Sequence, residues 1–175
     1  YFSYQVSSSK DALWLYRFVL FFAVLHALSF FNFLYVFPSD KIILAKWYKA
    51  YMLPVAIFTA FLCLTPLVFS DIAGSVKVGE IINPERGIGM FLFGLVIPIF
   101  IFDGIFLFLK KTLKARGTER RKFVYILIGA ILSLALIIIF NFVLPAIFGI
   151  MKFIPFAPVF LLPFAFFAAY AIIKY

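Results

Sequence analysis

Five long stretches of the chain carry apolar side chains on every side, and shorter segments richer in polar residues separate them. These stretches cover residues 13–36, 51–69, 88–109, 123–147 and 153–173. A helix needs about 20 apolar residues to cross the hydrocarbon core of a bilayer, and none of the stretches shows the alternation of transmembrane β-strands. The pattern predicts an all-α integral membrane bundle with five transmembrane helices, forming a single transmembrane domain over residues 1–175.

The composition agrees with lipid as the solvent for most side chains. Of the 175 residues, 66% are apolar, 22% aromatic and 13% charged, whereas soluble domains average about 45–50% apolar and about 25% charged residues. Such a chain lacks the polar surface of a soluble enzyme. The single cysteine, Cys63, excludes an intrachain disulfide framework and a cysteine-based metal site.

The Lys and Arg residues are distributed unequally between the two ends of the predicted helices. If all five stretches cross the membrane, five basic residues fall on the side of the chain start and eleven fall on the opposite side. Cytoplasmic connections carry the excess of Lys and Arg in membrane proteins. We therefore expect a multi-pass protein of the plasma (inner) membrane, with the N-terminus outside and the C-terminus in the cytoplasm.

A basic segment between the third and fourth stretches holds most of this excess. It contains Lys110, Lys111, Lys114, Arg116, Arg120, Arg121 and Lys122. Clustered basic residues also occur in nucleic-acid-binding proteins, but cytoplasmic retention and attraction to anionic lipid head groups explain this segment without a further partner. We expect the lipid bilayer as partner and no nucleic acid.

Ionisable and amide side chains inside membrane spans are costly and therefore mark candidate functional positions. We select Arg17, His26, Asp103 and Asn141. Arg17 lies close enough to the start of its stretch to reach the outer interface as an anchor. His26 and Asp103 lie at similar depths, about 20 and about 22 Å from the outer ends of their helices, so they are candidates for signal sensing as a bonded pair. The alternative is a protonated or hydrated Asp103, with His26 bonded to a backbone carbonyl.

Asn141 lies four residues before Pro145, which lacks the amide proton that would bond the carbonyl of residue 141 in a regular helix. A kink is predicted at Pro145, where the Asn141 amide supplies polar partners or holds a water; the alternative is a ligand-lining role for Asn141. A second kink is predicted at Pro163, in the outer half of the last stretch. Residues 164–175 then continue as a regular helix. The outer half of this stretch should therefore bend, and its inner half should transmit a movement as a rigid helix.

Three further features bear on packing and chemistry. Three pairs of small residues four apart allow a close approach between helices: Ala56 with Ala60, Gly129 with Ser133, and Ala165 with Ala169. The connection at 75–87 suits a short hairpin, with Val76 and Val78 alternating before a turn near Gly79. One histidine and seven acidic residues, most of them in connections, supply no catalytic triad or metal cluster. We therefore expect no enzymatic activity in this segment, no metal and no cofactor.

Several strings along the chain resemble the N-terminal seven-transmembrane sensor region of bacterial histidine kinases. They are LHALSFFNFLYVFP, ARGTERRKFVYILIGA leading to FNFVLP, and AFFAAYAIIKY, which stand in the order and spacing of that family. The matching positions are Arg116, Gly117, Glu119, Arg120, Asn141, Pro145 and 169–172. The departure is that only five stretches are present, so the resemblance implies a fragment without the first two helices and without the kinase.

The resemblance implies a membrane-embedded sensor for a bacterial signal-transduction protein of the two-component type. The last helix would pass the signal to a cytoplasmic output module outside this chain, and a homodimer is expected from the resemblance alone. His26, inside the membrane, does not suit a phosphoacceptor. Two other classes stay open: a small membrane transporter or channel, which would need a polar pathway, and a structural accessory subunit of a membrane complex.

Overall fold

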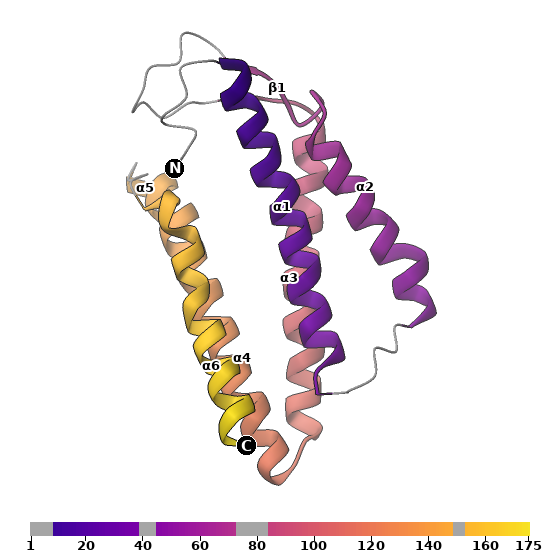
Figure 1. The fold of residues 1–175 in the computed structure, drawn as a ribbon, viewed down its shortest axis with the longest axis vertical. Helices are drawn as coiled ribbons and strands as arrows, with labels where there is room; N and C mark the ends of the chain where they lie inside the picture. The colour runs from indigo at the N-terminus through magenta and orange to yellow at the C-terminus, as the bar shows by residue number, and fades with distance from the viewer. Residues whose placement is uncertain (1–8, 39–44, 73–83, 149–152) are drawn as a thin grey trace. The chain divides into compact units, whose positions relative to one another are not determined.

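The computed structural model describes residues 9–38, 45–72, 84–148 and 153–175, and most of these residues are helical (Figure 1). Within this part of the chain, four helices are long and apolar enough to cross a membrane. They are Lys10–Val36, Gly89–Lys114, Gly117–Asn141 and Phe156–Lys174. This finding agrees with a multi-pass helical membrane protein, and four of the five predicted stretches coincide with these helices.

The second predicted stretch, 51–69, forms a shorter helix, so the count of five spans is not confirmed. The π-helical turn η2 (Tyr48–Met52) continues directly into α2 (Leu53–Cys63). The amides of Leu64 and Thr65 bond the carbonyls three residues earlier, at 3.0 Å each, which tightens the last turn. Pro66 follows, and a proline disfavours helical backbone in the residue before it. The helix therefore ends at Cys63.

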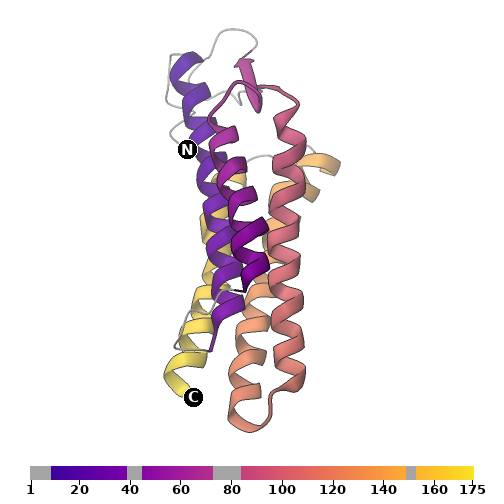
Figure 2. The same cartoon turned by 90° about the vertical axis from the view of Figure 1, so that its right-hand side faces the viewer.

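The chain divides into two compact units, residues 1–104 and 105–175, and each is described here by itself. In the first unit, α1 (Ser9–Val36) and α2 run side by side (Figure 2). Tyr48, before α2, contacts Phe31 and Asn32 late in α1, whereas Phe61, near the end of α2, contacts Phe21 with ring centroids 6.2 Å apart. The two helices are therefore antiparallel.

A two-stranded antiparallel sheet follows α2 and precedes α3 (Gly89–Lys114). Strand β1 (Phe69–Ile72) pairs with β2 (Pro84–Arg86), with Phe69 opposite Arg86 and an irregular register beyond that pair. Gly87 bonds the Val68 carbonyl at 2.9 Å, and a Cβ at this glycine would lie only 2.1 Å from the Leu67 carbonyl oxygen. The predicted hairpin residues Val76, Val78 and Gly79 lie outside the described residues.

The second unit is built on a helical hairpin in which α4 (Gly117–Ile138) runs beside α6 (Leu162–Lys174) (Figure 1). Between them lie the π-helical turn η3 (Ile139–Val143), the short helix α5 (Leu144–Phe148) and the 3₁₀ helix η4 (Ile154–Leu161). A Cβ on Gly129 would lie 2.7 Å from the Cβ of Phe167. The predicted close approach at Gly129 and Ser133 therefore occurs, between α4 and α6.

Candidate functional site

Arg17 fastens the first turns of α1 to strand β1. Its side chain is 6% exposed, and Nη2 donates a hydrogen bond to the Phe69 carbonyl at 2.6 Å. The guanidinium carbon also lies 5.3 Å from the centroid of the Trp14 ring, within the range of a cation–π contact. The sequence predicts an anchor that reaches the outer interface. The structure shows a buried guanidinium that joins two elements 52 residues apart, and the position of Arg17 at a membrane interface stays a prediction.

The Arg17 guanidinium has a buried nitrogen, Nε, without a hydrogen-bond partner among the described residues. Removing a charge from water is expensive unless a counter-charge or further hydrogen bonds compensate it. The hydrogen bond to the Phe69 carbonyl and the contact with the Trp14 ring offset only part of the free-energy cost of burying this guanidinium.

The structure does not join His26 and Asp103. Both side chains are exposed on the surfaces of α1 and α3, and no hydrogen bond or ion pair links them within the described residues. At this level α3 meets α1 through Gly104, where a Cβ would lie 3.4 Å from the Cα of Phe31. Since successive helical residues point about 100° apart, Asp103 lies to the side of this contact. Their pairing and their role in sensing stay predictions.

Asn32 and Tyr48 form a polar contact that the sequence reasoning missed. The Tyr48 hydroxyl donates to Asn32 Oδ1 at 2.5 Å, and the Tyr48 side chain is 1% exposed. Its ring stacks on Phe31 with a centroid distance of 5.7 Å and an interplanar angle of 4°. Asn32 is an amide inside the 13–36 stretch, so the rule that selected Asn141 would have found it. The contact fixes the start of η2 against α1.

Both π-helical turns stand just before a proline. The Leu53 amide bonds the Tyr48 carbonyl before Pro54, and the Leu144 amide bonds the Ile139 carbonyl before Pro145, so both bonds reach back five residues. A proline ring clashes with the carbonyl four residues earlier in an α-helix, and a wider π turn relieves this crowding. At Pro145, where a kink is predicted, the irregularity therefore takes the form of a π turn.

Asn141 lies inside the turn η3 and carries an unused acceptor. Its Oδ1 atom is buried without a hydrogen-bond partner among the described residues, whereas the side chain as a whole is half-buried. A buried acceptor without a donor costs free energy. The position therefore suits a water or a ligand group that donates a hydrogen bond. A water agrees with the structural interpretation of Asn141 beside a kink, and a ligand group agrees with the ligand-lining role.

Ser133, late in α4, caps the start of α6. Its Oγ accepts a hydrogen bond from the backbone amide of Phe164 at 3.0 Å. The first amides of a helix have no partner within the helix, and Pro163, which lacks an amide, fits the first turn. Pro163 is therefore part of the start of α6, directly after the 3₁₀ helix η4.

Aromatic contacts attach the rest of α6 to α4. Tyr125 of α4 contacts Phe167, Tyr170 and Tyr175, with ring centroids 6.3, 5.1 and 5.9 Å away. The Lys174 ammonium donates to the Tyr170 hydroxyl and lies 5.7 Å from the Tyr175 ring centroid. Together with Gly129 and Ser133, these contacts hold α6 along its whole length.

No group of three or more His, Cys, Asp or Glu side chains that could hold a metal ion occurs among the described residues. Comparison of the chain with protein-family models, with curated proteins and with solved structures found no match.

Proposed function

We propose that this chain is the membrane-embedded signal-input region of a bacterial signal-transduction protein. In this proposal α6 passes the signal to a cytoplasmic output module outside these residues. The observation that supports it best is the change of structure along the last stretch, from the 3₁₀ helix η4 to the regular helix α6 that begins at the Ser133 cap. The resemblance to histidine kinase sensor regions points the same way.

The two parts of the last stretch suit different tasks. A 3₁₀ helix has poorer hydrogen-bond geometry than an α-helix and is rarely longer than one or two turns, so η4, with Pro158 inside it, is the deformable part. α6 keeps a regular hydrogen-bond ladder to Lys174. Because α4 packs at Gly129 directly against the Phe167 Cβ and the Phe164 backbone of α6, a shift of α6 requires α4 to move with it. The moving element proposed here is the α4–α6 hairpin.

A stimulus shifts such an element only if it binds one arrangement better than the other. The groups proposed to face the stimulus are His26, Asp103 and Asn141, which stand in the helices with no partner among the described residues. Asn141 is the best placed of them, because it lies in η3 between α4 and the start of α5. A ligand that donates to its Oδ1 would act directly at the end of α4.

The proposed topology has five crossings, with the chain start outside and Tyr175 in the cytoplasm of the plasma membrane. Support for the crossing at η2–α2 comes from its two ends. Tyr48 contacts Asn32, and Phe69, six residues beyond α2, contacts Arg17. Fifteen residues of α1 separate these two levels, which is about 22 Å along a helix. The basic segment then faces anionic lipid head groups in the cytoplasmic leaflet, and the family resemblance favours a homodimer.

Insertion of alanines after Lys174 tests the signalling role without a known stimulus. The chain is joined through α6 to a cytoplasmic histidine kinase module, and autophosphorylation is measured in membranes with zero to four inserted residues. Each insertion rotates the module by about 100°, so we expect the output to vary with a period of three to four residues. An output that is indifferent to insertion contradicts the proposal. Solute uptake by vesicles containing the chain alone would instead favour a transporter.

A further inference from the structure

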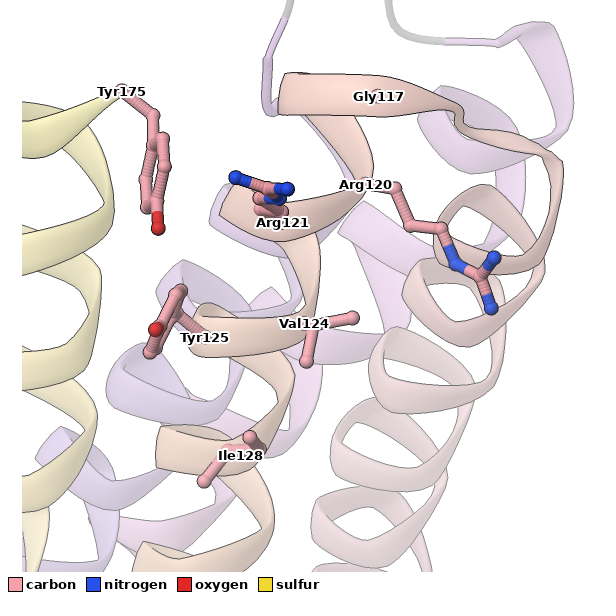
Figure 3. A pocket seen from close by; sticks show the side chains of 7 residues that line it. All are labelled: Gly117, Arg120, Arg121, Val124, Tyr125, Ile128 and Tyr175. Atoms are coloured by element: carbon pink, nitrogen blue, oxygen red, sulfur yellow. The ribbon is translucent and has the colours of Figure 1, made fainter.

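An open groove of about 580 Å³ lies on the first turns of α4, with Tyr175 at its edge (Figure 3). Arg120 and Arg121 stand at its start, and Val124 and Ile128 line it one and two turns further along the helix. All lining residues belong to the second unit. The groove therefore combines a cationic end with an apolar wall.

Two aromatic hydroxyls border the same groove. Tyr125 and Tyr175 both line it, and their rings stack with a centroid distance of 5.9 Å and an interplanar angle of 25°. Figure 3 shows Arg121 on the same side of α4 as these two rings, whereas Arg120 projects to the other side of the helix. Neither arginine has an ion-pair partner among the described residues. Guanidinium and phenol donors are thus both available to one acidic group.

This set of donors matches a phosphodiester. Guanidinium groups bind phosphate oxygens with two parallel hydrogen bonds, in a geometry that lysine cannot reproduce. The apolar wall selects among phosphate compounds, because Val124 and Ile128 offer nothing to the polar part of a free phosphate. They do suit an acyl chain, and Arg120 and Arg121 lie in the first turns of the candidate span Gly117–Asn141, where a lipid–water boundary is expected.

We propose that this groove binds the head group of an anionic phospholipid, with the phosphate at Arg121 beside Tyr125 and Tyr175 and the first part of an acyl chain along Val124 and Ile128. Arg120 adds positive charge from the other side of α4. The inference deepens the general lipid attraction of the basic segment proposed above and rests on it for the bilayer boundary at this end of α4. Because Tyr175, directly after Lys174 of α6, lines the groove, an occupied groove holds this part of the chain against α4. Anionic lipid content then becomes an input to the proposed output helix.

Lipid retention by the purified chain tests the site, with no need for a signalling readout. The chain is reconstituted with phosphatidylglycerol or with phosphatidylcholine, and the bound lipid is counted by native mass spectrometry after release from detergent. The double variant Arg120→Gln/Arg121→Gln is compared with Lys114→Gln/Arg116→Gln, which removes the same charge from the same basic segment outside the groove. Since each basic residue near an anionic surface contributes a several-fold gain in binding, we expect roughly tenfold weaker phosphatidylglycerol binding in the first variant and a much smaller loss in the second.

Three outcomes would overturn the site. Equal losses in the two variants mean that the net charge of the basic segment binds the lipid, which leaves the proposed sensor function and the general attraction untouched. If the chain retains phosphatidylcholine as well as it retains phosphatidylglycerol, the arginines do not distinguish an anionic head group from a zwitterionic one. Displacement of the lipid by inorganic phosphate at millimolar concentration means that the ligand is a soluble phosphate. If the glutamine pair fails to fold, the pair Arg120→Lys/Arg121→Lys keeps the charge but loses the paired hydrogen bonds, and unchanged binding in that variant would also overturn the site.

Discussion

The Oγ atom of Ser133 lies 3.0 Å from the backbone nitrogen of Phe164 and accepts its proton, although 31 residues separate the two. The hydroxyl thus supplies the partner that the first amides of α6 lack within their own helix. It does so at the point where the 3₁₀ geometry of η4 changes to α-helix. This bond lies where the 3₁₀ helix η4 ends and the regular helix α6 begins.

Replacement of Ser133 by alanine should weaken the hairpin. The variant removes the Ser133 acceptor from the Phe164 amide, and a hydrogen bond of this kind contributes about 0.5–1.5 kcal/mol. The free energy of unfolding in mixed detergent micelles measures this loss. Ser29→Ala is the matched control, because the Ser29 hydroxyl is exposed and donates only to Leu25 of its own helix. A Ser133→Ala variant as stable as the control would show that the cap contributes nothing.

Replacement of Gly129 by alanine should separate α4 from α6. The added Cβ would meet the Cβ of Phe167 at 2.7 Å and the Pro163 carbonyl oxygen at 3.1 Å, so the helices must shift. Overpacking of this kind costs about 1–3 kcal/mol. In Gly94→Ala, the control, the new Cβ meets nothing within 4 Å, and the gain in helix propensity should leave it neutral or slightly stabilised. Thermal unfolding that is identical in the two variants would contradict the close contact.

Replacement of Tyr48 by phenylalanine removes the proton donor to Asn32 and keeps the stacked ring. The half-buried Asn32 side-chain oxygen then loses its donor, and we expect a destabilisation of about 1 kcal/mol. Tyr51→Phe, at a side chain that is 71% exposed, should cost much less. In a cycle with Asn32→Leu, the double variant should be more stable than the sum of the two single losses predicts. Strictly additive losses would mean that the two groups do not interact.

The sequence was sufficient for those features that depend on local apolar length. Residues 88–109 and 123–147 form helices because about 20 apolar residues outweigh the internal prolines: α3 contains Pro98, and the π turn η3 precedes Pro145. In the 51–69 stretch, apolar length alone was misleading, because Thr65 and Pro66 end α2 and Phe69 enters a strand. Pro66 was the visible signal for that boundary.

The polar contacts were harder to foresee, since each depends on a partner far away in the chain. The bond from Arg17 to the Phe69 carbonyl was not predicted, because nothing near Arg17 in sequence reveals that carbonyl. The spacing of Gly129 and Ser133 predicted a close contact but not that α6 would be the partner. Asn32 could have been selected by the same rule as Asn141, and its omission was an error of reasoning rather than a limit of the sequence.

The central proposal is that the basic segment and Tyr175 lie on the cytoplasmic side of the membrane and that the β1–β2 sheet lies outside. Single cysteines at Thr118 and Ser70, both exposed, are introduced in a Cys63→Ser background and labelled in intact cells with a thiol reagent that does not cross membranes. We predict that Ser70→Cys reacts in intact cells and that Thr118→Cys reacts only after the membrane is opened. Reaction of both positions in intact cells, or of neither, would contradict the account.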